Sequence, residues 1–220
     1  MDDISNSIKK IIDLLEKIPH NYEEITQKTP YYNMAATLTD AVLQAGMNYK
    51  SVVYPRVYNI LNKYADYRTT CEFIILFQTI AIEEIIQWKN KKKQNTICEL
   101  AWFLYNQCIN TEDDLAKWIL DDVNAESLLE IKGVGRKTID YLKLLCGQQA
   151  IPIDRHMFQF LELAGVVVND YKEASYILRK TASFLEIGES VLDKTIWKYM
   201  AEKNNDKQIT LYEFFGETMQ

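Results

Sequence analysis

Apolar residues recur every three or four positions along most of the chain, which is the spacing of one buried face of a helix. The first such run spans residues 4–18, and Pro19 should end it. Further helices are predicted over residues 34–45, 51–61, 71–88, 94–108, 115–120, 128–131, 139–146, 157–163, 171–185 and 191–201. No segment predicts a strand with similar strength. The pattern therefore predicts an all-α protein of about ten helices.

Polar residues mark several of these helix starts. Thr111 precedes three acidic residues, which is the order of an N-cap followed by an acidic first turn. We interpret residues 124–127 in the same way, as the start of helix 128–131. Residues 71–88 are apolar on most sides, which is typical of a helix at the centre of a bundle. Residues 207–220 predict a packed terminal helix.

Composition narrows the class of protein. Hydrophobic residues make up 48% of the 220 residues and charged residues 25%, as in ordinary soluble globular proteins. No apolar run reaches the roughly 18 residues of a membrane span. The first residues lack the basic and apolar regions of a secretory signal. We therefore expect a soluble intracellular protein, in the cytoplasm and nucleoid or in a nucleus, that binds no membrane.

The metal-ligating residue types are scattered along the chain. Cys71, Cys98, Cys108 and Cys146 include no C-x-x-C pair, and His20 has no second histidine near it in sequence. Metal and cluster sites usually contain closely spaced ligands. We therefore expect the cysteines to be buried as small apolar side chains, and we expect no side-chain metal site.

The net charge of −6 argues mildly against a nucleic-acid partner, because neutralisation of phosphates supplies much of the affinity of such proteins. An acidic body can still carry a local basic face. Lys89 and the run 91–93 lie just before helix 94–108. These lysines could contact phosphates or form a solvated corner, and the sequence favours neither.

Two of the 7 glycines, Gly133 and Gly135, lie one residue apart and are followed by Arg136 and Lys137. Glycines let the backbone turn between two helices and let a ligand approach where no Cβ stands in the way. The unpaired amides at the start of the second helix can hold an anion such as a phosphodiester. A plain helix–helix turn explains the same residues, so the turn alone leaves both interpretations open.

Lys137 falls in the first turn of that second helix, where the helix dipole disfavours a cation and favours the neutral, nucleophilic amine. Downstream, the apolar residues 150–153 lead to Asp154 at the start of another helix, where aspartate can act as an N-cap. Lys137 and Asp154 together are more informative than either residue alone.

The segment 131–138 (I-K-G-V-G-R-K-T), followed by Gly147, Pro152 and the D-R-H triplet 154–156, resembles the hallmark of the helix-hairpin-helix DNA glycosylases of the endonuclease III superfamily (HhH-GPD). That hallmark is an L-x-G-V-G-x-K-T hairpin with a catalytic aspartate in a D-x-H context. Fainter similarity extends over residues 34–201.

The resemblance implies two helical lobes with the site in the cleft between them. Residues 34–147 would form a barrel lobe that ends in the hairpin at about 124–146. Residues 1–33 and 148–220 would form the second lobe. The partner would be double-stranded DNA with a damaged base or an abasic site, bound by a monomer.

The activity implied is that of a DNA glycosylase with associated AP lyase activity that removes a damaged, in our expectation oxidised, base. By position, Lys137 would attack C1′ of the sugar and form a Schiff base. Asp154 would stay ionised and stabilise the positive charge that develops on the sugar. His156 would support the loop around Asp154.

The resemblance also implies where DNA is held. The hairpin residues Gly133, Val134, Gly135, Arg136 and Thr138 would contact a phosphate, and such hairpins often bind a monovalent cation through their backbone. The loop after helix 34–45 would enter the duplex. Its candidate wedge or pocket residues are Gln44, Met47, Asn48 and Tyr49.

Two of the departures of this sequence from the family pattern concern the cofactor and the wedge. No cysteine follows Cys146, so the iron–sulfur cluster of endonuclease III is not expected, and neither is any other cofactor. Gly46 stands where close relatives place a wedge glutamine. Two alternatives stay open, namely a non-catalytic helix-hairpin-helix DNA-binding protein and a monofunctional glycosylase. The acidic charge and the altered wedge favour the first, whereas Lys137 and Asp154 oppose it.

Overall fold

The structure is a computed structural model that describes residues 3–18 and 30–203. Within these ranges it contains twelve α-helices and no strand, so the prediction of an all-α protein is confirmed. No helix in the described part is long and apolar enough to cross a membrane. Contacts divide the chain into a central unit, residues 27–148, and a terminal unit, residues 1–26 with 149–220.

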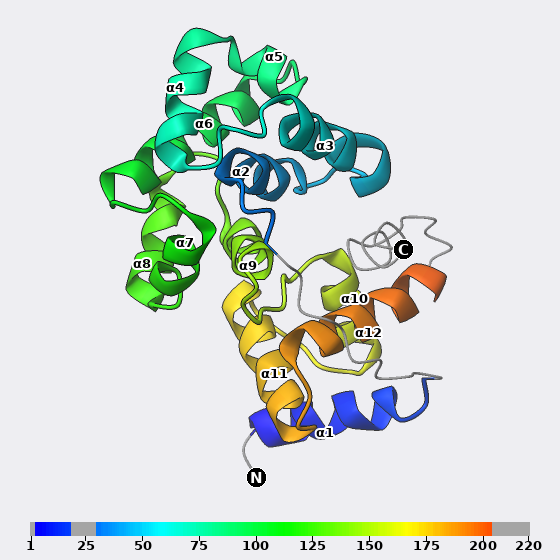
Figure 1. Cartoon of the computed structure of the whole chain (residues 1–220). Coiled ribbons are helices and arrows are strands. Elements are labelled where there is room, and N and C mark those ends of the chain that lie inside the picture. The colour runs from blue at the N-terminus through cyan, green and yellow to red at the C-terminus, as the bar shows by residue number, and fades with distance from the viewer. Residues whose placement is uncertain (1–2, 19–29, 204–220) are drawn as a thin grey trace. The chain divides into compact units, whose positions relative to one another are not determined.

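The central unit is built around a buried helix, α2. All of α2 (Met34–Leu43) is buried, and it packs against α3, α6 and α9 (Figure 1). A π-helical turn, Tyr49–Val53, leads into α3. The other helices of this unit are α3 (Tyr54–Lys63), α4 (Thr70–Thr79), α5 (Ile82–Ile86), α6 (Lys91–Asn106), α7 (Glu112–Trp118), α8 (Asp122–Ser127) and α9 (Arg136–Leu145). A short 3-10 turn, Leu128–Glu130, follows α8.

The single central helix predicted over residues 71–88 is wrong. The chain leaves helical geometry at Ile80, which has extended backbone angles, and α4 and α5 are separate helices. The hydroxyl of Thr79 donates back to the carbonyls of Ile75 and Leu76 at 2.6 and 3.0 Å. Such side-chain bonding to the preceding turn weakens the continuation of a helix.

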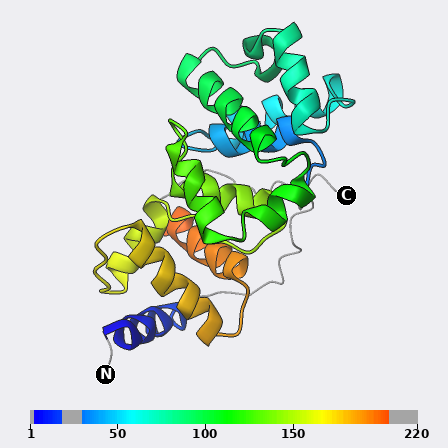
Figure 2. The ribbon, with the colours of Figure 1, turned by 90° about the vertical axis from the view of Figure 1, so that its left-hand side faces the viewer.

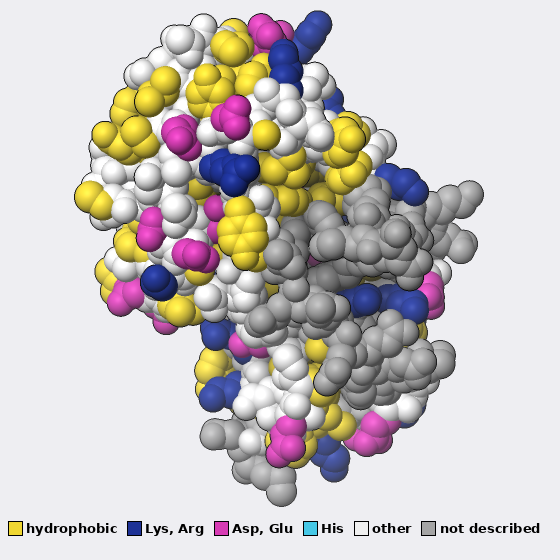
Figure 3. All heavy atoms as spheres, viewed as in Figure 1, with side chains coloured by type: hydrophobic (Ala, Val, Ile, Leu, Met, Phe, Trp, Pro, Cys, Tyr) yellow, Lys and Arg dark blue, Asp and Glu magenta, His cyan; other side chains and the backbone are white. Residues whose placement is uncertain are grey.

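Aromatic contacts hold α4 against α6 at the surface of the central unit. The ring of Trp102 in α6 meets Phe77 and Tyr105 edge to face, with centroids 6.4 and 5.9 Å apart. Ile75, Trp102 and Tyr105 are exposed, and Figure 3 shows hydrophobic side chains gathered over these helices. Helices α4 and α6 therefore each expose apolar side chains at the surface of the central unit.

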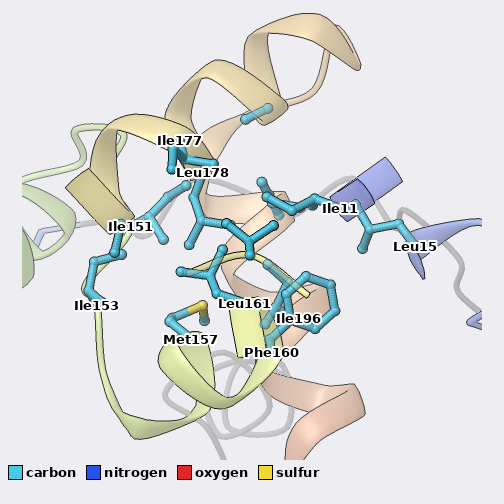
Figure 4. Packing of buried hydrophobic residues seen from close by; sticks show 14 of the residues in the cluster. Ile11, Leu15, Ile151, Ile153, Met157, Phe160, Leu161, Ile177, Leu178 and Ile196 are labelled. Atoms are coloured by element: carbon cyan, nitrogen blue, oxygen red, sulfur yellow. The ribbon is translucent and has the colours of Figure 1, made fainter. Parts of the chain in front are cut away.

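The terminal unit packs four helices around one core. They are α1 (Asp3–Leu15), α10 (Arg155–Leu163), α11 (Tyr171–Phe184) and α12 (Glu189–Lys203). Helix α1 packs against α11 (Figures 1 and 2). The core includes Phe160, Leu178 and Ile196, with Ile151 and Ile153 from the segment before α10 (Figure 4). This segment is thereby anchored immediately before Asp154.

Of the two predicted helix starts, one is confirmed and one is wrong. Thr111 is the N-cap of α7, and it forms a capping box with Asp114. The interpretation of residues 124–127 as a helix start is wrong, because the Asp121 side chain accepts from Val123 N and Asn124 N and so starts α8 earlier. The helix predicted over residues 207–220 lies outside the described residues.

The cysteines differ in environment. Cys146 is buried, Cys71 and Cys98 are half-buried, and Cys108 is exposed. The expectation of four buried thiols is therefore wrong. Cys108 follows the last turn of α6 with a left-handed φ of 58°, and this chain reversal turns its side chain out of the apolar face that the helical spacing predicted.

A buried carboxylate joins α7 to the start of α2. Glu112 is 3% exposed, and its Oε1 accepts from Asn33 N at 2.7 Å and from Thr37 Oγ1 at 2.9 Å. Burial is the largest effect on this group, and it raises the pKa of Glu112 above its ordinary value.

We predict that this carboxyl makes stability depend on pH. Its pKa is higher in the folded state, so its contribution is fully present below the unfolded value of about 4.3 and is lost as pH rises through the folded value. Between about pH 4 and pH 7, the free energy of unfolding of the wild type should therefore fall relative to that of Glu112→Gln. Denaturant unfolding at a series of pH values measures this difference. A difference that rises with pH would contradict the prediction.

Candidate functional site

The predicted hairpin is a tight turn between the 3-10 turn 128–130 and α9. Gly133 has a left-handed φ of 94°, and the amide of Val134 donates to Ile131 O at 3.0 Å. The side chain of Val134 is buried, whereas Gly135 is the N-cap of α9 and is exposed. The first amides of α9 therefore begin at an exposed turn, the arrangement that can receive an anion.

The two glycines are needed for different reasons. A Cβ on Gly133 would lie 2.5 Å from Thr96 Oγ1 of α6, in addition to the strain of the positive φ. A Cβ on Gly135 would meet no atom within 4 Å, and its φ of −122° suits any residue. The protein itself requires glycine at 133. At 135 the space beside the backbone is open to a ligand.

We predict that alanine substitutions separate these roles. Gly133→Ala should lower the free energy of unfolding by about 2–3 kcal/mol, because it combines a left-handed residue with a steric clash. Gly135→Ala should cost under about 1 kcal/mol, since alanine is a poorer N-cap than glycine. It should nevertheless weaken duplex binding, because its methyl group fills the open space. Denaturant unfolding and fluorescence anisotropy measure the two effects. Equal losses of stability would contradict this distinction.

The polar side chains of the hairpin are partly engaged within the protein. Arg136 Nη1 donates to Glu126 Oε1 of α8 at 2.9 Å, in an ion pair whose side chains are 32% and 49% exposed. Thr138 is 5% exposed. Among the predicted phosphate ligands, the backbone at Gly133 and Gly135 is thus more accessible than the side chains of Val134 and Thr138. Glu126 was not anticipated, and only its place in α8 brings it to Arg136.

Lys137 is the second residue of α9, at the turn that follows the glycines. Its side chain is half-buried. Helix α9 has no acidic residue in its first turn. The positive end of the α9 dipole disfavours a cation in the first turn. Helix stability therefore does not explain why a lysine occupies position 137.

Asp154, in the terminal unit, is the N-cap of α10. Its Oδ1 accepts from His156 N at 2.9 Å and from Met157 N at 3.3 Å. The preceding backbone is held by Ile153 N, which donates to Tyr171 Oη at 3.0 Å. The carboxylate is half-buried. N-capping thus fixes the orientation of the Asp154 carboxylate, and by itself it explains why an aspartate occupies this position.

His156 has a packing role next to Asp154. It is 2% exposed, and its ring meets Trp197 of α12 edge to face with centroids 5.6 Å apart. This contact ties the first turn of α10 to α12, which helps to hold the loop that carries Asp154.

The loop predicted to enter the duplex follows α2. Gln44 Nε2 donates to Tyr141 Oη of α9 at 2.6 Å, and Gly46 turns the chain with a φ of 82°. Asn48 is exposed and caps the π-helical turn, where its Oδ1 accepts from Ser51 N at 3.0 Å. Met47 is half-buried. The exposed part of this loop is therefore Gly46 and Asn48.

Tyr49, also predicted for the wedge, lies in the core of the central unit. It is 1% exposed, and its hydroxyl is 3.2 Å from that of Tyr31, which donates to Asp40 Oδ2 at 2.7 Å. Burial and then the neighbouring Asp40 raise the pKa of both tyrosines. Tyr49 is therefore a neutral phenol that faces a carboxylate rather than solvent. The polar Asp40 within an apolar helix was the signal for this cluster, and the sequence interpretation missed it.

No group of three or more histidine, cysteine, aspartate or glutamate side chains in the described part of the chain is arranged to hold a metal ion.

A family model described as "Domain of unknown function (DUF8548)" matches residues 87–201, more than half of the chain. The chain belongs to this family. The DUF8548 match runs from the residues just before α6 into α12, so it includes the hairpin, Lys137 and Asp154. A comparison with curated proteins gave no match.

Among solved structures, this DUF8548 protein is similar to "Crystal structure of H.pylori 3-methyladenine DNA glycosylase (MagIII) bound to 1,N6-ethenoadenine". The TM-score is 0.60 at 16% sequence identity, and the match covers 90% of this chain and 98% of that chain. A likeness at this identity concerns the fold. The predicted helix-hairpin-helix glycosylase fold is confirmed, whereas the narrower assignment to an endonuclease III-like subgroup stays a prediction.

Proposed function

We propose that this protein is a base-excision DNA glycosylase that acts, as a monomer, on double-stranded DNA with a damaged base or an abasic site. The observation that carries the proposal is the hairpin, where the open backbone at Gly135 begins a helix whose second residue is Lys137. A phosphate at Gly133–Gly135, with a monovalent cation, would place the adjacent sugar within reach of that lysine. The shared fold with a 3-methyladenine DNA glycosylase supports this proposal.

The finer proposal is a bifunctional reaction. The neutral amine of Lys137 attacks C1′, and the glycosidic electron pair leaves with the base, which takes up a proton. The sugar ring opens to a Schiff base between C1′ and Lys137. Loss of a C2′ proton then expels the 3′ phosphate by β-elimination. The Asp154 carboxylate stabilises the positive charge on the sugar. The proposal requires that both residues act on the same nucleotide.

A panel of duplexes, each with one lesion, tests the function. We expect release of an oxidised base. The panel also includes 3-methyladenine and 1,N6-ethenoadenine, because the structurally similar enzyme is a 3-methyladenine DNA glycosylase bound to 1,N6-ethenoadenine. Borohydride treatment of an abasic duplex tests the lyase step, because it reduces a Schiff base to a stable covalent adduct.

The outcomes distinguish three functions. Base release with trapping supports the bifunctional glycosylase, and base release without trapping indicates a monofunctional one. Duplex binding with neither activity on any lesion would overturn the enzyme proposal in favour of a non-catalytic DNA-binding protein. The N-cap role of Asp154 gives that last alternative a specific basis, since it explains the residue without chemistry.

A further inference from the structure

The lysine run before the predicted helix 94–108 lies within α6, and its members have different surroundings. Lys91 pairs with Glu83 at 3.1 Å, and Lys92 is exposed. Lys93 turns inward. Its Nζ donates to Val42 O at 2.5 Å and lies 3.5 Å from Ala45 O. The ammonium group of Lys93 therefore neither extends into solvent nor lies where it could contact a phosphate.

Lys93 caps the C-terminal end of α2. Val42 lies in the last turn of that helix, and Ala45 follows it. Carbonyls at a helix C-terminus lack partners within the helix and carry the negative end of its dipole, so an ammonium group bound there is stabilising. The contact fixes the point from which the loop 44–48 departs.

Thr96, one turn later in α6, makes the corresponding contact with the hairpin. It is 4% exposed, and its Oγ1 lies 2.8 Å from Lys132 O and 2.9 Å from Lys92 O. Its hydroxyl group is also the atom that a Cβ on Gly133 would strike. The turn that precedes Gly133 therefore rests against α6.

A third contact joins the loop to the helix that follows the hairpin, because Gln44 of the loop donates to Tyr141 of α9 at 2.6 Å. All of these residues belong to the central unit, and α2 packs between α6 and α9 (Figure 1). The first turns of α6 thus contact the hairpin, which the proposed function assigns to a phosphate, and the loop, which the family resemblance places in the duplex.

We propose that Lys93 and Thr96, which we call the α6 anchor, are positioning residues. They hold the loop 44–48 and the hairpin 133–135 in one rigid register, that is, at a fixed position relative to each other. This inference rests on the proposed function for its DNA-binding role. A phosphate held at the hairpin then sets where the exposed residues of the loop meet the duplex. Wedge insertion needs this register, because a loop free to move would lose part of the binding free energy in ordering itself.

Hydrogen exchange of the free protein tests the anchor without DNA. In Lys93→Met, which keeps most of the aliphatic chain, amide exchange over residues 42–49 should rise about tenfold, as expected for loss of a charged helix C-cap. Lys92→Met, with the same change of charge in the same turn, should leave that segment unchanged. Thr96→Val should raise exchange over residues 132–136 instead. Unchanged protection of residues 42–49 in Lys93→Met overturns the proposal.

A milder variant covers the case in which Lys93→Met does not fold. Tyr141→Phe removes only the phenol oxygen that accepts from Gln44. It should raise exchange over residues 42–49 by about threefold, as expected for one neutral hydrogen bond. No change in this folded variant would show that the loop does not depend on this hydrogen bond. Unchanged protection of residues 132–136 in Thr96→Val would contradict the proposed anchor.

The DNA-binding role is tested with a duplex that contains a tetrahydrofuran abasic analogue beside 2-aminopurine, whose fluorescence rises when a wedge unstacks it. At saturating protein, Lys93→Met should reduce this signal by at least about threefold, while its Kd stays within about threefold of wild type because the hairpin is intact. A full signal would refute the DNA-binding role. If the wild type does not bind the duplex, the proposed function fails, and the exchange experiment still decides whether the anchor holds the two segments.

Discussion

Lys137→Ala should abolish borohydride trapping on an abasic duplex. Trapping requires a side-chain amine that condenses with the C1′ aldehyde, and alanine at the second position of α9 offers none. Alanine has the highest helix propensity, so the fold should be retained. The loss should therefore exceed about 100-fold while duplex binding persists. Denaturing gel electrophoresis of the covalent adduct measures it.

Lys143→Ala is the matched control for this variant. Lys143 lies in the last turn of the same helix and carries the same charge, so its loss changes the net charge equally without removing the proposed nucleophile. The control should trap as the wild type does. If Lys137→Ala also trapped at the wild-type level, another amine would be the nucleophile and the role proposed for Lys137 would be wrong.

Asp154→Asn should slow base release by at least about 100-fold, the size of effect seen when one group that stabilises transition-state charge is removed. Asparagine caps helices about as well as aspartate does, and its Oδ1 can still accept from His156 N and Met157 N. The free energy of unfolding should therefore change by under about 1 kcal/mol, through the weaker interaction with the helix dipole. Single-turnover assays and denaturant unfolding measure the two quantities.

Asp170→Asn provides the comparison for Asp154→Asn. Asp170 is the N-cap of α11, where its Oδ1 accepts from Glu173 N at 2.8 Å, and no chemistry is assigned to it. It should show the same small change in stability with no loss of base release. Wild-type rates in Asp154→Asn would mean that the carboxylate serves only as a cap, and the charge-stabilising role would be abandoned.

Much of the fold could be predicted because helices depend on residues close together in sequence. The apolar spacing located most of them, and Thr111 started α7 where its side chain indicated. The failures were also local, at Thr79 and at Asp121, where polar side chains bond to nearby backbone and move a helix end. Hydrophobic spacing carries no information on such bonds.

In the candidate site, too, the sequence predicted the features that depend on neighbouring residues and left the others undecided. The sequence alone placed Lys137 in the first turn of α9 and Asp154 at the start of α10, because a glycine turn and an aspartate cap act on their immediate neighbours. The same local reasoning treated Gly133 and Gly135 as equivalent and left the lysine run undecided.

Only the tertiary structure decided those questions. Thr96 lies so close to Gly133 that a Cβ there would clash with it. The side chain of Lys93 extends to the C-terminal end of α2. The tertiary structure also buried Tyr49, one of the candidate wedge or pocket residues, against Tyr31. The physical reason is that each of these contacts joins segments distant in sequence. Their geometry follows from how the helices pack, and neither local propensity nor hydrophobic spacing determines it.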